Sequence, residues 1–247
     1  MKTIKDINYG NTNHPDQVLD IHLPDAEEFP VFVYFHGGGI ESGDKEMPEL
    51  TECLINKGIA LVSCNYRMYP TAVYPEFIRD AACAVAWVKN NIENYGKVTK
   101  IFVGGSSAGG YLSMMLCFDK KYLSPYGIDP DTIDGFIHDA GQPTCHYNVL
   151  RERGLDTRRV IVDESAPVFH ITENKNYPPM LFIVSDNDME NRYEQTKLLL
   201  STIRHFNGEL PQITLKEMHG THCQYVHDLE YADHYVFGKI VTDYILS

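Results

Sequence analysis

The sequence predicts a single α/β domain spanning residues 1–247, built on a mostly parallel sheet of about eight strands with helices on both faces. Strand-like and helix-like segments alternate along the chain at the spacing of βαβ units. The length of 247 residues suits one domain. The composition, 43% hydrophobic and 22% charged, supplies enough apolar material for a full core.

The expected strands are short apolar runs that end in polar or glycine-rich loops. Two segments near the N-terminus, Thr3–Asn8 and Gln17–Leu23, form a lead-in pair. The remaining strand candidates, in chain order, are Val31–Phe35, Ala60–Asn65, Lys100–Val103, Gly135–Asp139, Met180–Ser185 and Gln212–Met218.

Helices are expected where apolar residues recur at a spacing of three to four. The pattern is clearest at Pro75–Asn91 and Glu190–Phe206, and a last helix is expected from about Tyr225 to Ile245. Two segments interrupt the alternation, residues 119–134 and 142–179, both rich in Pro, Gly, Asp and Arg. The second lies between two strand candidates, so it is either a lid or cap that shapes a substrate pocket or an ordered surface excursion.

A glycine-rich turn follows the strand candidate Lys100–Val103 and contains Gly-x-Ser-x-Gly centred on Ser107, before an apolar, helix-like run. Strand, sharp turn and helix are the context that a nucleophile elbow requires. Small residues are needed there because the turn is strained and passes close to its neighbours. We therefore expect Ser107 to be a nucleophile and the N–H of Ala108 to stabilise an oxyanion. Register argues against Ser106, since an alanine would then replace the second glycine.

A second glycine-rich segment, His36-Gly37-Gly38-Gly39, follows the strand candidate Val31–Phe35. Three glycines after a buried strand let main-chain N–H groups face a substrate, and lipases and esterases build an arm of the oxyanion hole in this way. A flexible turn is the alternative for this segment alone. The presence of both glycine motifs, each after a strand of the same kind, favours the oxyanion hole.

A serine hydroxyl needs a general base, and the base needs a carboxylate to orient it. When an elbow supplies the serine, the acid and then the base follow at the ends of later strands. One such loop is Ser185-Asp186-Asn187-Asp188 and the other is His219-Gly220-Thr221-His222. The acid is therefore Asp188 or Asp186, and the base is His222 or His219.

We favour Asp188, because the acid loop must leave the sheet for a few residues before it can reach the histidine. An aspartate directly after a strand, as at Asp186, is more often a turn former or a helix cap. We favour His222 for a similar reason, since Gly220-Thr221 lets the chain turn back toward Ser107.

A metal site is the other interpretation of His219 and His222, which have His227 and His234 nearby. Their His-x-x-His spacing lies on an expected loop and has no carboxylate at the offset of a zinc protease. We therefore expect no metal, and the triad chemistry needs no cofactor.

The net charge of −13 argues against nucleic acid or an anionic membrane as a partner. The N-terminus lacks the apolar core of a signal peptide, and no apolar stretch approaches the length of a membrane span. The six cysteines include no Cys-x-x-Cys pair. We expect reduced thiols and a cytoplasmic protein, and the sequence leaves the oligomeric state open.

Taken together, these motifs resemble the α/β-hydrolase superfamily, in the branch of small esterases similar to hormone-sensitive lipase and to the BD-FAE-like carbohydrate esterases. The resemblance covers nearly the whole chain. Besides the glycine motifs, it rests on four further segments: Asn65–Pro70, Tyr74-Pro75 before Asp80, Ser165-Ala166-Pro167 and Pro178–Leu181. It implies an α/β-hydrolase fold with a small or minimal cap.

The resemblance also implies that Gly38 and Gly39 are the oxyanion donors of the first arm. The acid of this branch follows a small residue by three positions, which fits Asp188, and its base follows Gly-x, which fits His222. The chain departs from the family at Ser106, where an Asp is common, and at Cys223, where a Gly is common.

The function expected from this resemblance is a serine carboxylesterase acting on short-chain acyl esters, with a small-molecule ester as its partner. Acylated carbohydrates and hydroxycinnamoyl esters are further expected substrates. The alternatives are an amide hydrolase similar to arylformamidase and a non-catalytic, ligand-binding homologue.

Overall fold

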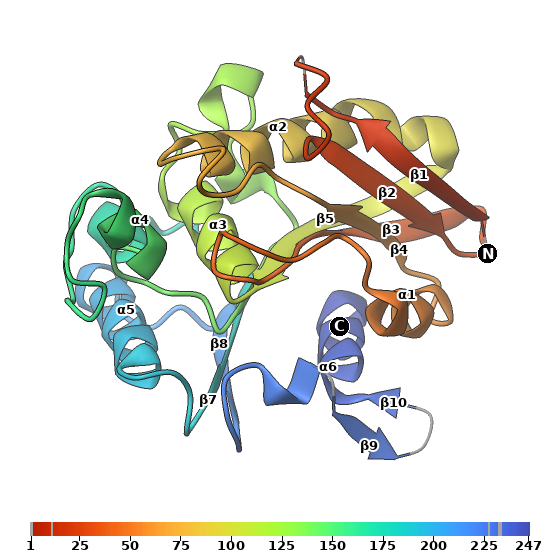
Figure 1. The fold of residues 1–247 in the computed structure, drawn as a ribbon. Helices are drawn as coiled ribbons and strands as arrows, with labels where there is room; N and C mark the ends of the chain where they lie inside the picture. Colours follow the sequence, from red (N-terminus) through yellow and green to blue (C-terminus); the bar gives the residue numbers. More distant parts are fainter. Residues whose placement is uncertain (1, 11, 227, 232–233) are drawn as a thin grey trace.

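Eight strands form one central sheet of the computed structural model, which describes residues 2–10, 12–226, 228–231 and 234–247 (Figure 1). The strands are β1 (Lys2–Asn8), β2 (Val18–Leu23), β3 (Glu28–Phe35), β4 (Ala60–Cys64), β5 (Lys97–Ser106), β6 (Gly135–Asp139), β7 (Met180–Ser185) and β8 (Ile213–Met218). Their order across the sheet is β1-β2-β4-β3-β5-β6-β7-β8. Pairing is antiparallel between β1 and β2 and between β2 and β4, and all other neighbours are parallel.

Helices cover both faces of this sheet, as the sequence predicted. On one face lie α2 (Glu76–Asn91), α3 (Ala108–Phe118) and α5 (Arg192–Asn207), and on the other lie α1 (Pro48–Ile55) and α6 (Val236–Leu246). Strand β3 shows how one segment serves two cores, because successive side chains point to opposite faces. Val31 and Val33 pack into the first core, whereas Phe32 and Tyr34 pack into the second.

The predicted helix from Tyr225 to Ile245 is wrong over its first part. The chain instead forms a 3₁₀ turn at Gln224–Val226 and a small antiparallel pair, β9 (Leu229–Tyr231) and β10 (His234–Tyr235), before α6 begins. Residues 227 and 232–233 lie outside the described ones. Where burial is described in this segment, buried apolar residues recur at helical spacing from Phe237 onward, which gives α6 a face to bury.

The two segments that interrupt the alternation contain little regular structure. Residues 119–134 form 3₁₀ turns at Ser124–Tyr126 and Pro130–Thr132. Residues 142–179 contain α4 (Tyr147–Glu152) and a 3₁₀ turn at Pro167–His170, beside a small apolar cluster of their own. None of the helices in the described part of the chain is both long and apolar enough to cross a bilayer.

Asp80 of α2 joins three parts of the chain. Its carboxylate, 2% exposed, accepts hydrogen bonds from Gln17 Nε2 at 2.7 Å and from Arg67 Nε and Nη2, both at 2.8 Å. The backbone N–H of Arg67 adds a fourth bond at 3.0 Å. A buried, bidentate pair of this kind fixes the loop after β4 against α2.

We expect Asp80→Ala to lower the free energy of unfolding by about 3–5 kcal/mol, because the partly buried guanidinium of Arg67 loses its buried, bidentate partner and keeps only the longer contact with Glu76 at 3.6 Å. Urea denaturation measures this change. Glu93→Ala, at an exposed position just after α2, is the matched control and should stay within about 0.5 kcal/mol of wild type. An Asp80→Ala effect as small as the control would show that the pair does not fix the loop.

Asp139, the last residue of β6, is a fully buried carboxylate. Its Oδ1 accepts a hydrogen bond from the Tyr225 hydroxyl, and its Oδ2 has no partner among the described residues. Burial raises the pKa of Asp139 to about 6, although the neighbouring Ser106 and Tyr225 hydroxyls favour the charged form. At neutral pH the fold therefore holds a charge that its surroundings only partly stabilise.

Because the pKa of Asp139 is higher in the folded than in the unfolded state, ionisation of Asp139 destabilises the fold. This destabilisation is absent at low pH and grows as the pH rises from about 4 to about 6. Asp139→Asn removes this destabilisation. The free energy of unfolding of the variant, relative to wild type, should therefore increase by about 2 kcal/mol between pH 4.5 and 7.5. Chemical denaturation at both pH values checks this, with Asp25→Asn as an exposed control; a pH-independent difference would contradict it.

Candidate active site

Ser107 lies in the sharp turn between β5 and α3. Its backbone, with φ 54° and ψ −110°, is in a region that residues other than glycine rarely adopt. The Ser107 N–H donates to the carbonyl of Asp139 at 2.8 Å, which ties the turn to the end of β6. Strain of this kind persists only where the surrounding structure enforces it, and it is typical of functional sites.

The glycines on each side of Ser107 are required by close packing against β3. A Cβ atom added to Gly105 would lie 2.4 Å from the carbonyl oxygen of Phe35, and one added to Gly109 would lie 1.9 Å from the same oxygen. Neither distance is possible for real atoms, so any side chain here would push the turn away from β3. The two glycines of Gly-x-Ser-x-Gly are therefore needed because the turn packs directly against the end of β3.

His222 lies between Ser107 and Asp188. Its Nε2 is 2.8 Å from the Ser107 hydroxyl oxygen, and its Nδ1 is 2.5 Å from Asp188 Oδ1. An ionised carboxylate only accepts hydrogen bonds, so Nδ1 carries the proton in the neutral ring and Nε2 offers its lone pair to the serine. The Asp188 side chain is fully buried, and that of His222 is 23% exposed.

The alternative acid and base do not lie near Ser107. Asp186 and His219 pair with each other, 2.7 Å apart, and their side chains are 49% and 96% exposed. The two loops thus contribute two carboxylate–histidine pairs, of which only the one formed by Asp188 and His222 touches the serine. In each loop the residue further from the strand is the one that reaches the site.

The glycine run after β3 lies against the nucleophile. A Cβ added to Gly37 would be 3.3 Å from the Ser107 Cβ, and Gly38 and Gly39 have positive φ values of 103° and 68°. The carbonyl of Gly39 accepts the Asn148 amide at 3.0 Å. Among the described residues, the backbone N–H groups of Gly38 and Gly39 have no hydrogen-bond partner. Ala108 is the first residue of α3, where a backbone N–H has no partner within the helix.

His36 holds the glycine run Gly37–Gly39 in place. Its Nδ1 is 2.7 Å from the Gly37 carbonyl, its ring stacks on Tyr66, and its own carbonyl accepts the Tyr66 hydroxyl at 2.9 Å. Burial lowers the pKa of His36, while the Gly37 carbonyl acts in the opposite direction. A neutral ring that donates through Nδ1 is thus the form that fits this position.

One open cavity connects these groups. It is lined by the glycine arm, Ser107 and His222, and also by Tyr147, Met189 and Cys223, which the sequence analysis did not identify as site residues. Met189 directly follows the candidate acid and Cys223 directly follows the candidate base. Adjacency to Asp188 and His222 was therefore the one sequence feature from which Met189 and Cys223 could have been predicted as site residues.

Ser106 belongs to the buried side of the turn. It is 4% exposed, and its hydroxyl oxygen accepts a hydrogen bond from Tyr34 at 3.0 Å. The register of β5 and β6 places Ser106 opposite Asp139, and the two side chains interact. The serine that register argued against is thus held in a polar network beneath the nucleophile.

No group of three or more His, Cys, Asp or Glu side chains in the described part of the chain could hold a metal ion. His227 and the side chain of His234, which belonged to the metal interpretation, lie outside that part. All six cysteines are free thiols.

Comparisons with known proteins identify two matching families and several related esterases. Residues 76–239 match the prolyl oligopeptidase family, and residues 19–129 match the BD-FAE family. Among curated proteins, the chain is 26% identical to Esterase LipC of Mycobacterium tuberculosis and 27% identical to the probable carboxylic ester hydrolase LipM of the same organism. Each alignment covers 79% of this chain, which spans 54% of LipC and 50% of LipM, about half the length of these relatives.

Two solved structures illustrate the fold. A truncated carbohydrate esterase from gut microbiota superposes with a TM-score of 0.80 at 20% identity, covering 100% of this chain and 95% of that one. An esterase from Pyrobaculum calidifontis gives a TM-score of 0.76 at 18% identity, covering 99% and 85%. The chain therefore has the α/β-hydrolase fold and belongs to the prolyl oligopeptidase family of that superfamily, with a BD-FAE match over residues 19–129.

Proposed function

We propose that this protein is a serine carboxylesterase with Ser107 as nucleophile, His222 as general base and Asp188 as the acid that orients it. The observation that carries the proposal is the continuous chain of short contacts from Asp188 Oδ1 through both ring nitrogens of His222 to Ser107 Oγ. A base within hydrogen-bond reach of a hydroxyl, itself held by a carboxylate, is the arrangement that makes serine nucleophilic.

In the first half of the reaction, His222 takes the proton of Ser107 as the hydroxyl oxygen attacks the ester carbonyl. Asp188 then stabilises the imidazolium, which later gives its proton to the leaving alcohol. The N–H groups of Gly38, Gly39 and Ala108 are the proposed donors to the tetrahedral oxyanion, and each donor of this kind contributes about 3–4 kcal/mol in comparable sites.

In the second half, a water molecule takes the place of the alcohol. His222 removes its proton, the water oxygen attacks the acyl-enzyme, and the acid leaves with Ser107 restored. The chemistry needs neither a metal nor a cofactor. Because the arm that holds Gly38 and Gly39 is fixed through His36, Tyr66 and Asn148, the donors would need little rearrangement during the reaction.

The names of the relatives support ester substrates. Both LipC and LipM are named for the hydrolysis of esters, whereas the prolyl oligopeptidase family is named for the hydrolysis of peptides. We propose small acyl esters as substrates and a single domain in which residues 142–179 form a small cap beside the site. Six free thiols and a net charge of −13 fit a soluble protein of a reducing compartment, and we propose a cytoplasmic location.

Removing either end of the contact chain tests the proposal. Ser107→Ala should reduce kcat for p-nitrophenyl acetate by roughly 10⁴-fold or more, and Asp188→Asn by about 10⁴-fold with little change in KM, because the wrong histidine tautomer would face the serine. Steady-state kinetics with active-site titration measures both effects.

Asp186→Asn and His219→Gln are the matched controls, since they alter the same loops and the same residue types without contact to Ser107. Both should keep at least about half of the wild-type kcat. Wild type that hydrolyses no ester faster than Ser107→Ala, or controls that fall as far as Asp188→Asn, would contradict the assignment.

Acyl-chain preference is the second expected outcome. The walls around Ser107 are mainly glycines and polar side chains, with Met47, Tyr147, Met189 and Val226 as the main apolar contributors. A buried methylene contributes up to about 0.8 kcal/mol only where apolar wall exists to receive it. We expect kcat/KM to fall from butyrate to octanoate in a series of p-nitrophenyl esters, and a rise through octanoate would show a deep apolar cleft instead.

A further inference from the structure

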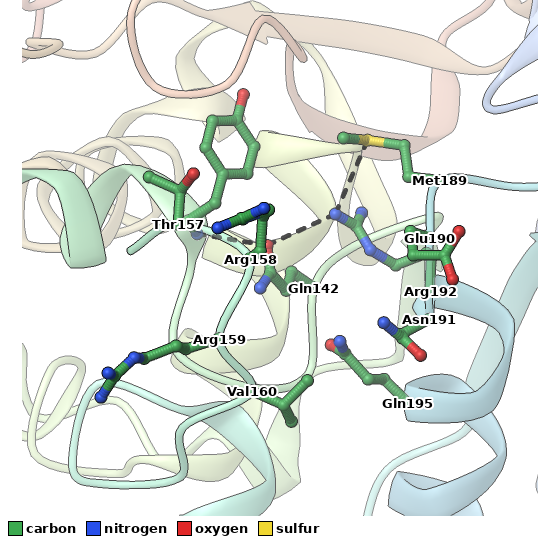
Figure 2. A pocket seen from close by; sticks show the side chains of 11 residues that line it. Gln142, Thr157, Arg158, Arg159, Val160, Met189, Glu190, Asn191, Arg192 and Gln195 are labelled. Atoms are coloured by element: carbon green, nitrogen blue, oxygen red, sulfur yellow. Dashed lines mark hydrogen bonds between the residues drawn. The ribbon is translucent and has the colours of Figure 1, made fainter. Parts of the chain in front are cut away.

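A second cavity adjoins the catalytic one. It has a volume of about 550 Å³, and two residues, Tyr147 and Met189, line both cavities. Its walls come from two segments: residues 157–160, within the proposed cap, and residues 189–195, which follow the candidate acid Asp188 and begin α5 (Figure 2). A substrate group that passes between Tyr147 and Met189 would therefore enter this second cavity.

The inner wall of this cavity carries a buried guanidinium. Arg192 is 3% exposed, and its guanidinium lies beside Met189 and Gln142 (Figure 2). It donates hydrogen bonds to the carbonyl of Ala140 and, at 3.4 Å, to Gln142 Oε1. Burial lowers the pKa of Arg192, which nearby Asp188 partly offsets, but no carboxylate of the described residues forms an ion pair with it. A guanidinium stays charged in proteins, so this buried charge lacks a direct counterion.

Two more arginines line the same cavity. Arg158 holds Asp156 through Nε at 3.0 Å and Nη2 at 2.7 Å, and both side chains are exposed. Arg159 makes no side-chain hydrogen bond or ion pair in the described part of the chain, and in Figure 2 it points outward at the edge of the cavity. Asp156 and Glu190 are the carboxylates on this side, and Asp188 acts on Arg192 from the side of the candidate triad, so three guanidinium groups face three carboxylates, of which only Asp156 forms a direct ion pair with one of them.

This concentration of positive charge is unusual for the chain, which carries 34 acidic and 21 basic side chains. The start of α5 adds to it, because backbone N–H groups in the first turn of a helix favour anions and Asn191 makes no capping hydrogen bond to them. The amide side chains of Gln142 and Gln195 supply uncharged hydrogen-bonding groups.

We propose that this cavity is a subsite for a carboxylate carried by the substrate, so that the preferred esters have one free acid group beside the scissile bond. The proposal rests on the esterase function proposed above. Arg192 is buried without a direct ion pair in the described part of the chain, and this one charge matches one carboxylate better than a phosphate, which carries close to two negative charges at neutral pH. An incoming carboxylate would compete with Asp156 for Arg158, and exposed pairs of that kind exchange at little cost in free energy.

Arg192 also supports the backbone, since it holds the carbonyl of Ala140, a residue with φ 47°. Its replacement could therefore disturb the fold. The exposed pair Arg158 and Arg159 avoids this difficulty, and the double variant Arg158→Gln/Arg159→Gln keeps most of the side-chain volume while it removes two charges.

The readout is the ratio of kcat/KM for a charged ester to that for its neutral counterpart. Monomethyl glutarate against methyl valerate places the carboxylate on the acyl side, and 4-acetoxybenzoate against 4-acetoxybenzamide places it on the alcohol side. Because the protein carries a net charge of −13, its overall field disfavours anions. We expect a wild-type ratio of about 10 or more for one of the pairs, falling at least 10-fold in the double variant through a higher KM.

Arg204→Gln is the matched control, since it removes an exposed arginine from the far end of α5, and its ratio should stay within twofold of wild type. Asp156→Asn should raise the ratio two- to threefold, because it removes the competing carboxylate. High salt should lower the wild-type ratio. A wild-type ratio of one or less for both pairs, or a double variant within twofold of wild type, would overturn the subsite.

Calorimetric titration of Ser107→Ala with 4-acetoxybenzoate and with 4-acetoxybenzamide separates this inference from the proposed function. If wild type hydrolyses no ester, the esterase proposal fails, whereas preferential binding of the benzoate that disappears on Arg158→Gln/Arg159→Gln still supports the subsite. Equal binding of both compounds would overturn the subsite even in an active esterase.

Discussion

The whole site depends on how closely the turn between β5 and α3 approaches the end of β3. The Phe35 carbonyl leaves no room for a Cβ atom at Gly105 or at Gly109. That contact brings Ser107, on one strand, next to the glycine run that leaves the neighbouring strand. Parallel pairing of β3 and β5 holds both strand ends in register, so the sheet itself positions Ser107 and the glycine run next to each other. The strained backbone of Ser107 is stabilised by the same packing.

Asp139 places a buried carboxylate beneath the turn that holds Ser107. The family often has an Asp where this chain has Ser106, and here the buried acid stands directly across the β5–β6 register, at Asp139. Its charge and that of His222 favour each other, and the Tyr225 hydroxyl supplies it with one hydrogen bond. Asp139 thus places a negative charge below the turn of Ser107, where a positive charge on His222 would be favoured.

The parts of the fold and site that the sequence predicted are those whose chemistry restricts the residue type. Gly105 and Gly109 are forced by backbone contact, and Asp188 and His222 follow from strand-end loops of known order. The β9–β10 pair escaped prediction because two short strands leave no periodic pattern. The second cavity, lined by Arg158, Arg159 and Arg192 and called the arginine cavity below, was not predicted. Arg158 and Arg192 lie 34 residues apart in the sequence, and only the tertiary structure shows that they line one cavity.

The loop after β7 contributes residues both to the candidate triad and to the second cavity. Asp188 and Arg192 lie four residues apart, the first fully buried against His222 and the second buried at the wall of the arginine cavity. Met189, between them, lines both cavities. A change in this loop that moved Arg192 would therefore also move Asp188, whereas Arg158 and Arg159 lie in the separate segment 142–179 and can vary without moving Asp188. If the proposed subsite selects the substrate, its specificity should be easier to change at residues 157–160 than in the loop of Asp188 and Arg192.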